Sequence, residues 1–268
     1  MGLWPEYPRS AEHQPAKRLV FADDFDSESL DLQRWSPYYL PHWTGNGLKK
    51  AHYAIQESRL ILSIEAEQMP WCPEYDGGVC VSALQTGHFA GPVGSSIGQH
   101  RFKPELVVRQ AHENQRLFTP CKGEIRIRVR AQLQKSDLIS LYLIGYEELP
   151  ENSGEITVFE IFGKNVDKNG VVIGRGIKKI NDERLKTEFT ESVFSLDLSE
   201  WHEYSMDWTD NGIRFFLDGK EIGMTNQSPN YPMQLMLTCY RLDRHPETGS
   251  SPVLEVDYVR AYEPVPPN

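Results

Sequence analysis

Hydrophobic and polar residues alternate along much of this chain, in short runs separated by turn residues. The clearest run covers residues 123–131, where Ile125, Ile127 and Val129 point to one side of a strand and polar side chains to the other. Residues 138–144 are almost wholly apolar, which predicts a strand covered on both faces. Further strands are predicted at residues 60–66, 154–162, 171–179, 192–198, 202–208, 212–217, 233–240 and 254–262.

Turn residues separate these runs at short intervals. Asp218-Gly219 stands between two β-like runs and predicts a two-residue hairpin, because both residues tolerate the positive φ angles of a type I′ turn. Helical periodicity is weak everywhere, and the best candidate is a turn or two at Asn181–Thr187. Many short strands with turns between them predict an all-β sandwich. Residues 90–120 and 145–153 are expected to form long loops, which often build binding sites.

Length and composition predict one globular domain. The chain has 268 residues, of which 39% are hydrophobic, enough for a single large β domain. We assign that domain to residues 19–263, after a polar, proline-bearing arm at 1–18 and before a short tail at 264–268. No repeat or interdomain linker interrupts it.

The net charge of −10 narrows the classes of partner. An acidic surface repels phosphate backbones and anionic lipid, so neither nucleic acid nor a membrane surface is expected. A neutral polysaccharide or oligosaccharide is not repelled, and a monomer is expected. No apolar run approaches the roughly 20 residues of a membrane span. The first ten residues lack the apolar stretch of a signal peptide, which leaves the compartment open.

The four cysteines do not predict a zinc site, because no two are spaced as a CxxC pair. Cys72 and Cys80 could close a loop through a disulfide in an exported protein. Free, partly buried thiols are the alternative for all four, which include Cys121 and Cys239.

Candidate chemistry lies in the run Gly154-Glu-Ile-Thr-Val-Phe-Glu-Ile-Phe-Gly163. In a regular strand Glu155 and Thr157 share one face, and Glu160 points to the other. One extra residue, a β-bulge, would return Glu160 to the face of Glu155. The surrounding strand is strongly apolar, and charged groups are costly there unless they are solvated or used.

A bulged strand would allow the two carboxyl groups to approach the separation of about 5–5.5 Å found in retaining glycosidases. One carboxylate would attack the anomeric carbon, while the other protonates the leaving oxygen and then deprotonates water. The alternative is that both glutamates lie on a solvated strand face.

The same segment resembles the Glu-x-Asp-x-x-Glu signature of glycoside hydrolase family 16, the laminarinase, lichenase and agarase family. The resemblance continues along residues 19–263. It is carried by Phe21-Ala-Asp-Asp-Phe-Asp with Leu30-Asp31 and Trp35, by Trp43-Thr-Gly-Asn46 with His52-Tyr53, by Trp201-His-Glu-Tyr-Ser-Met-Asp-Trp208 with Ile213-Arg-Phe-Phe-Leu-Asp-Gly219, and by Val256-Asp-Tyr-Val-Arg-Ala-Tyr262.

This resemblance implies a jelly-roll β-sandwich of two packed antiparallel sheets, similar to concanavalin A, with the glutamates on its concave face. It also implies Glu155 as nucleophile and Glu160 as acid/base, and it places Trp43 and Asn46 in a sugar-contacting loop. No cofactor is implied for catalysis. Some members of the family hold a structural calcium, and Asp257 matches one of its ligand positions.

Several positions depart from the family pattern. Thr157 replaces the central Asp, and it can donate a hydrogen bond to the nucleophile but carries no charge. Ser82-Ala-Leu84 lacks the family's Arg, Ile139-Ser-Leu-Tyr-Leu143 lacks its tryptophans, and residues 174–179 offer no match to its His. These departures suggest an unusual substrate or a loss of hydrolysis.

Aromatic side chains are further candidates because sugar rings stack on them. Trp43, Trp71, Tyr142 and Tyr240 could bind sugar, and plain packing is the alternative for each. Arg241 is placed in a polar loop, where it could contact substrate. We therefore predict a retaining glycoside hydrolase or transglycosylase acting on a β-linked polysaccharide. The alternatives are a carbohydrate-binding jelly roll that has lost hydrolysis and a sandwich with a structural or adhesive role.

Overall fold

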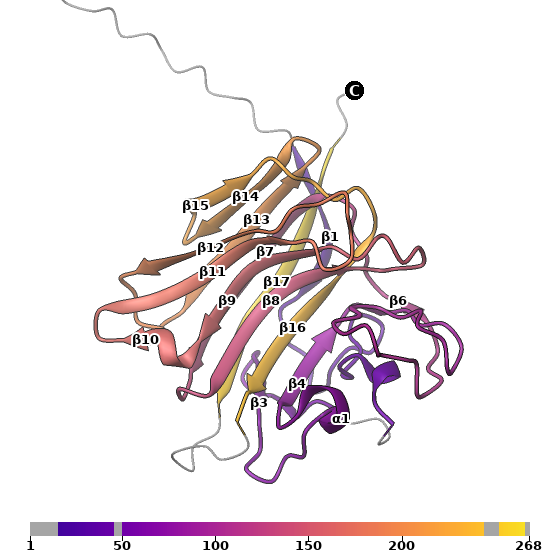
Figure 1. Cartoon of the computed structure of the whole chain (residues 1–268). Helices are drawn as coiled ribbons and strands as arrows, with labels where there is room; N and C mark the ends of the chain where they lie inside the picture. The colour runs from indigo at the N-terminus through magenta and orange to yellow at the C-terminus, as the bar shows by residue number, and fades with distance from the viewer. Residues whose placement is uncertain (1–15, 46–49, 244–251, 266–268) are drawn as a thin grey trace, which may run out of the picture.

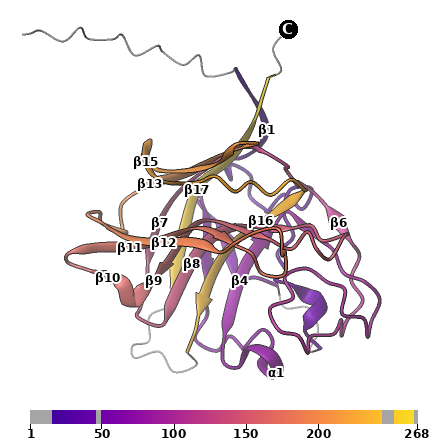
Figure 2. The ribbon, with the colours of Figure 1, turned by 45° about the horizontal axis from the view of Figure 1, so that its top comes forward.

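Two antiparallel sheets pack face to face in the computed structural model, which describes residues 16–45, 50–243 and 252–265. Figure 1 shows the ribbon, and the tilted view in Figure 2 separates the two layers. The predicted all-β jelly-roll sandwich is thus confirmed. No helix in these described stretches is long and apolar enough to cross a bilayer.

The first sheet has eight strands in the order β15-β14-β13-β7-β17-β3-β2, and β1 also pairs with β17. Its strands are β1 (Lys17–Asp23), β2 (Tyr53–Ile55), β3 (Leu60–Ser63), β7 (Gly123–Gln132), β13 (His202–Thr209), β14 (Gly212–Leu217), β15 (Lys220–Thr225) and β17 (Val253–Pro264).

The second sheet has seven strands in the order β10-β11-β9-β8-β16-β4, and β12 also pairs with β11. Its strands are β4 (Cys80–Gln85), β8 (Asp137–Gly145), β9 (Glu155–Phe162), β10 (Val166–Asp167), β11 (Gly170–Lys178), β12 (Glu188–Phe194) and β16 (Met233–Arg241). The remaining elements are the small pair β5 (Gly87–His88) and β6 (Gln115–Arg116), and the short helices α1 (Pro73–Asp76), η1 (Pro41–Trp43) and η2 (Gly163–Asn165).

The main core lies between the two sheets and follows from the alternation in the sequence. Ile125, Ile127 and Val129 of β7 are buried in it, as predicted. Arg128 and Arg130 point away from it and form ion pairs with acids of β17. Full burial of one apolar side chain of this size stabilises the folded state by about 1.5–3 kcal/mol relative to leaving it exposed. All nine residues of β8 are buried, which confirms the prediction that both of its faces are covered.

A second apolar cluster covers part of the other face of the second sheet, which we call the outer face. It joins outer-face residues of β8 and β16, such as Tyr142 and Met236, to residues of the long N-terminal loops, such as Leu40, Trp43 and Leu106. The loops therefore pack on the sheet at the β4 end, as Figure 1 shows, and the β9–β11 end holds the polar residues described below.

The strand limits differ from the predicted ones in a few places. β12 runs from Glu188 to Phe194 rather than over 192–198, and Asn181–Thr187 forms turns and no helix. The Asp218-Gly219 hairpin is confirmed, with positive φ at both residues. β1 begins at Lys17, inside the predicted arm at 1–18, and β17 ends at Pro264, inside the predicted tail at 264–268. The two strands pair with each other.

Candidate active site

A β-bulge interrupts β9, as the spacing of its glutamates predicted. On β8, Leu141 pairs with Phe159 and the next residue, Tyr142, pairs with Thr157, which leaves Val158 as the extra residue. The register with β11 shifts at the same place. Because one residue is inserted, the side chains before and after it fall on the same face.

The bulge brings Glu155, Thr157 and Glu160 together on the outer face. The hydroxyl of Thr157 donates a hydrogen bond of 2.7 Å to Glu155 Oε1. Lys178 of β11 contacts both acids, with its Nζ 3.1 Å from Glu155 Oε1 and 2.9 Å from Glu160 Oε2. Both acids are largely buried, with side-chain exposures of 6% for Glu155 and 17% for Glu160.

The shared contact to Lys178 limits how far apart the carboxyl groups can be. One oxygen of each acid lies about 3 Å from the same nitrogen, so these two oxygens are at most about 6 Å apart, which is compatible with the 5–5.5 Å of retaining glycosidases. The arrangement can therefore support attack by one carboxylate and proton transfer by the other.

Lys178 is the residue that the sequence analysis missed. It lies opposite Glu155 in the ladder, and Gly174, Gly176 and Lys178 share one face of β11 by simple alternation. Pairing β9 with β11 would have placed the lysine beside the acids. Burial alone lowers the pKa of Lys178, but the charges and hydrogen bonds of Glu155 and Glu160 outweigh it and raise the pKa above its usual value.

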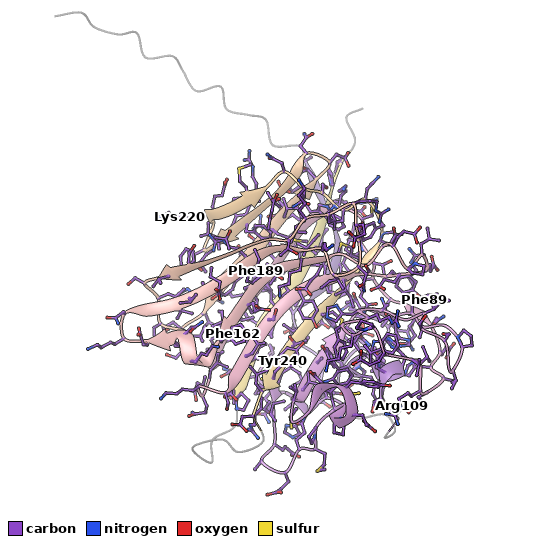
Figure 3. All side chains as sticks on the ribbon, in the orientation of Figure 1. Phe89, Arg109, Phe162, Phe189, Lys220 and Tyr240 are labelled. Atoms are coloured by element: carbon purple, nitrogen blue, oxygen red, sulfur yellow. The ribbon has the colours of Figure 1, made fainter. Side chains whose placement is uncertain are left out.

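An aromatic ring lies next to this charged group. Phe189 of β12 stands opposite Gly176, with its ring centroid 4.6 Å from Lys178 Nζ. A Cβ on Gly174 would lie 2.5 Å from the Phe189 ring, so the ring rests over glycine backbone. Phe162, two residues after Glu160, is also half-buried on this face. Figure 3 labels both rings on the sheet.

Two titratable groups from the loops complete the surroundings. Burial lowers the pKa of His100, which lies close enough to feel the charges of Glu155 and Lys178. The backbone N–H of His100 donates to Glu147 Oε1 at 2.6 Å, and burial raises the pKa of Glu147 to about 8. Both groups are therefore mainly neutral near pH 7.

The predicted aromatic contacts are mostly buried. Tyr142 lies next to the acids, opposite Thr157, but it is only 5% exposed and its hydroxyl pairs with that of Tyr240 at 3.0 Å. The Tyr240 hydroxyl in turn donates to Tyr39 at 3.2 Å. These rings form a hydrogen-bonded wall beside the site and present no open face for stacking.

Both candidate tryptophans are core residues. Trp43 has no exposed surface, and its indole N–H donates to the Gln99 carbonyl at 2.9 Å. Trp71 donates to Asp76 Oδ2 at 2.7 Å and packs edge-on against Tyr39. The expectation that they stack on sugar is thus corrected, because the long loops fold over them. Asn46 lies outside the described residues.

Arg241 is another correction. It is the last residue of β16 rather than a loop residue, and only 3% of it is exposed. Its guanidinium donates to the carbonyls of Ile64 and Glu65 at 3.3 and 3.2 Å. The arginine therefore ties β16 to the chain after β3 and is not available to substrate.

The possible calcium ligand is also engaged elsewhere. Asp257 Oδ2 accepts a hydrogen bond of 2.7 Å from the guanidinium of Arg128. Within the described residues, no three His, Cys, Asp or Glu side chains are grouped as metal ligands. Calcium binding at Asp257 stays a prediction. All four cysteines lie in the described stretches, and none of them forms a disulfide there, Cys72 and Cys80 included.

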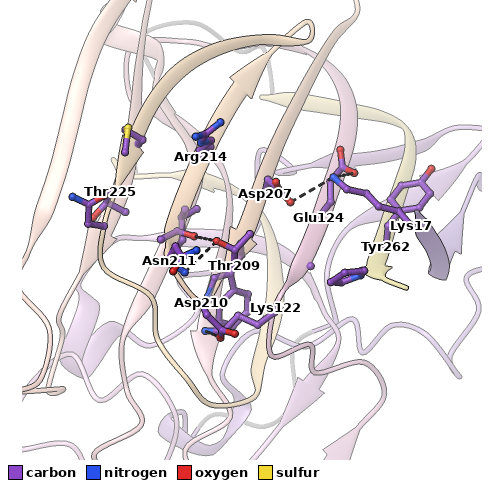
Figure 4. A pocket seen from close by; sticks show the side chains of 17 residues that line it. Lys17, Lys122, Glu124, Asp207, Thr209, Asp210, Asn211, Arg214, Thr225 and Tyr262 are labelled. Atoms are coloured by element: carbon purple, nitrogen blue, oxygen red, sulfur yellow. Dashed lines mark hydrogen bonds and ion pairs between the residues drawn. The ribbon is translucent and has the colours of Figure 1, made fainter. Parts of the chain in front are cut away.

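A pocket of about 690 Å³ lies on the first sheet, at the ends of β13 and β14, away from the glutamates (Figure 4). Its charged groups neutralise one another: Lys17 lies 2.8 Å from Glu124, and Lys122 lies 3.7 Å from Asp210. The acid pair with a single shared lysine on the outer face is the stronger candidate for chemistry.

Comparison with models of known protein families assigns the chain to one of them. The model of "Glycosyl hydrolases family 16" matches residues 115–260, more than half of the chain, including β9 and β11. The chain belongs to glycosyl hydrolase family 16. Among proteins of curated function, none matches its sequence.

Solved structures of glycosyl hydrolases agree with this family. A GlcNAcα1-4Gal releasing endo-β-galactosidase from Clostridium perfringens superposes with a TM-score of 0.79 and 26% identity, over 97% of this chain and 66% of that one. The catalytic domain of an endo-1,3-β-glucanase from Thermotoga petrophila gives 0.66 and 16%, over 93% and 99%. The E269S variant of LamA from Z. galactanivorans, solved in complex with laminaritriose and laminaritetraose, gives 0.62 and 17%, over 91% and 98%.

Proposed function

We propose that this family 16 chain is a retaining glycosidase that cleaves a β-linked glycan at an internal bond. The observation that carries the proposal is the pair of carboxyl groups on one face of β9, whose oxygens in contact with Lys178 lie at most about 6 Å apart. The chemistry needs only these two acids, and no cofactor enters it.

In the proposed first step, Glu155 attacks the anomeric carbon while Glu160 gives its proton to the leaving oxygen, and a covalent glycosyl ester forms. In the second step, Glu160 removes a proton from water, the water oxygen attacks the same carbon and Glu155 is released. The hydrogen bond from Thr157 fixes Glu155 for attack and supports its charge.

The proposed substrate class is a glycan with an internal β-galactoside. This follows from the C. perfringens endo-β-galactosidase, with which the chain shares 26% identity and a TM-score of 0.79, against 16% and 0.66 for the endo-1,3-β-glucanase from T. petrophila. The chain spans about two thirds of the length of that galactosidase, so the activity carried over is that of the shared part alone. The half-buried ring of Phe189, next to the acids, is the proposed platform for a sugar ring.

A second candidate function is sugar binding without hydrolysis. Two observations favour it: Thr157 brings no negative charge next to the nucleophile, and Lys178 lies between the acids where the reacting bond would be. A sugar-binding protein would show no turnover in the wild type and would keep its affinity after Glu155→Gln. A hydrolase would show turnover in the wild type, and Glu155→Gln would abolish the turnover but not the affinity.

Product stereochemistry separates these functions. Proton NMR during digestion of a galactose-containing glycan with terminal GlcNAcα1-4Gal units, and of laminarin, should show the β-anomer of the new reducing end first. Glu155→Gln and Glu160→Gln should abolish the release of this product. Glu183→Gln, which changes an exposed ion pair, should leave the release unchanged. Early appearance of the α-anomer, or unchanged turnover in the two site variants, would rule out this mechanism.

A further inference from the structure

The ammonium group of Lys178 occupies the space that the reaction needs. Its nitrogen lies 3.1 Å from one proposed catalytic oxygen and 2.9 Å from the other. In a retaining mechanism the scissile bond lies between these two carboxyl groups. Substrate and lysine therefore compete for one position.

In the protein without sugar, the positive charge of this lysine offsets the repulsion between the two acids. Two ionised carboxylates a few ångströms apart repel each other, and a shared cation offsets that repulsion. Lys178 stays charged, because the two acids raise its pKa despite its burial. Its side chain keeps 27% exposure, so the lysine borders solvent.

Other titratable groups that face the pair do not replace this charge. From the loops, His100 and Tyr39 are neutral near pH 7, since burial lowers the pKa of His100 and raises that of Tyr39 to about 12. From β8 and β16, Tyr142 and Tyr240 have raised pKa values for the same reason. On β12, Glu191 pairs with Gly174 of β11, which in turn pairs with Glu160 of β9. This residue is an acid, so it supplies no second cation to the pair.

The ammonium has one contact besides the two acids. In the same position its Nζ lies 4.6 Å from the centroid of the Phe189 ring, a cation–π contact. The flexible four-carbon stem of lysine allows the ammonium to move toward solvent without backbone movement.

We propose that Lys178 is a displaceable counter-ion that holds Glu155 and Glu160 ionised in the free protein and leaves them when a sugar enters. Without the cation the two carboxylates cannot both stay charged, so Glu160 takes one proton from solvent. No other bond forms or breaks in this step. Glu160 thereby becomes the acid that the first chemical step requires. Lys178 is thus a positioning residue, and the inference rests on the proposed function.

Proton uptake on sugar binding tests this displacement. Calorimetric titration at pH 7 in two buffers of different ionisation enthalpy counts the protons taken up, with GlcNAcα1-4Gal disaccharide and laminaritriose as probes. The wild-type protein should take up about one proton per bound sugar. Lys178→Met should take up less than half of that, because its free acid pair already shares one proton.

Two further variants control for loss of charge and of structure. Lys178→Arg should restore the uptake, and Lys179→Gln, which removes the adjacent lysine from its exposed pair with Glu183, should behave as wild type. Binding by the wild type without proton uptake would overturn the proposal, even where Lys178→Met does not fold. Equal uptake in Lys178→Met and wild type would overturn it too.

Carboxyl ¹³C NMR of the free proteins gives a test that needs no sugar. At pH 7 the wild type should show Glu155 and Glu160 both ionised, and Lys178→Met should show one proton shared between them. Identical spectra for this pair in both proteins would overturn the inference. Failure of both probe sugars to bind would instead argue against the proposed function.

Discussion

Thr157 stands between the two acids along β9, and its hydroxyl donates a hydrogen bond to Glu155, the proposed nucleophile. Thr157→Val removes the 2.7 Å hydrogen bond to Glu155 and keeps the side-chain shape. A bond to a charged group contributes about 1.5–3 kcal/mol, so kcat should fall roughly ten- to a hundredfold. Steady-state kinetics on the cleaved glycan measures this.

Thr238→Val is the matched control for that change. Thr238 is a buried threonine of β16 that donates to the Ser140 carbonyl at 3.2 Å and touches neither acid. Its loss should lower stability and leave kcat unchanged. If both valine variants lose the same activity, the role given to Thr157 is wrong.

Trp43 shows how burial overturned a prediction made from a loop motif. Trp43→Phe removes the indole donor of the bond to Gln99 and leaves the buried carbonyl without this partner. The free energy of unfolding should fall by about 1–3 kcal/mol, with sugar affinity unchanged. Chemical denaturation and calorimetry measure the two quantities. A loss of affinity with full stability would return Trp43 to the binding site.

At the scale of the element, β11 and β12 decide which groups stand beside the bulged strand. Phe189→Ala removes the ring that lies over the glycines of β11. Affinity for the probe sugars should fall roughly three- to tenfold, the amount expected for a lost aromatic contact. Val193→Ala, an exposed change further along β12, serves as control. Equal effects of the two changes would contradict the platform assigned to Phe189.

The strands of this molecule could be predicted where alternation was strict, and less well elsewhere. Residues 123–131 gave β7 almost to its ends, and the spacing of Glu155 and Glu160 gave the bulge of β9. β12 was misplaced because its burial is irregular, with exposed residues on both faces. Lys178 was missed because it joins the acids only through the pairing of β9 with β11, which local sequence does not specify.

The aromatic candidates failed for a reason at the same scale. A strand or loop tryptophan looks alike in sequence whether it lines an open face or lies beneath a loop. The second apolar cluster, which joins the N-terminal loops to the outer face of the sheet, buries Trp43, Trp71 and Tyr240 together. Such long-range contacts between residues 40–110 and the sheet cannot be derived from periodicity.

At the scale of the whole molecule, buried histidines make stability depend on pH. His42 and His88 contact each other at 3.0 Å, and burial lowers the pKa of both, to about 3 for His88. The unfolded chain binds protons on them below about pH 6.5, and the folded protein does not. Stability should therefore fall as pH drops from about 6.5 toward 3, by up to about 1.4 kcal/mol per pH unit for each histidine.

Glu147 gives stability the opposite dependence on pH. Its pKa is raised to about 8 by burial, so the folded protein retains a proton that the unfolded chain loses above about pH 4.5. The stability tied to this proton is lost as pH rises from about 4.5 to about 8. Glu147→Gln should then gain stability relative to wild type between pH 5 and 9. Thermal unfolding across this range measures it, and a constant difference would contradict the assignment.

The central claim is that Glu155 forms a covalent bond to sugar, and trapping that bond tests it most directly. An activated 2-deoxy-2-fluoro-β-galactoside forms the ester and slows its hydrolysis, so the adduct accumulates. The corresponding glucoside is tested in parallel. Peptide mass spectrometry should place the label on Glu155 in the wild type and find none in Glu155→Gln. A label on another residue, or unlabelled protein that still turns over its glycan, would contradict the account.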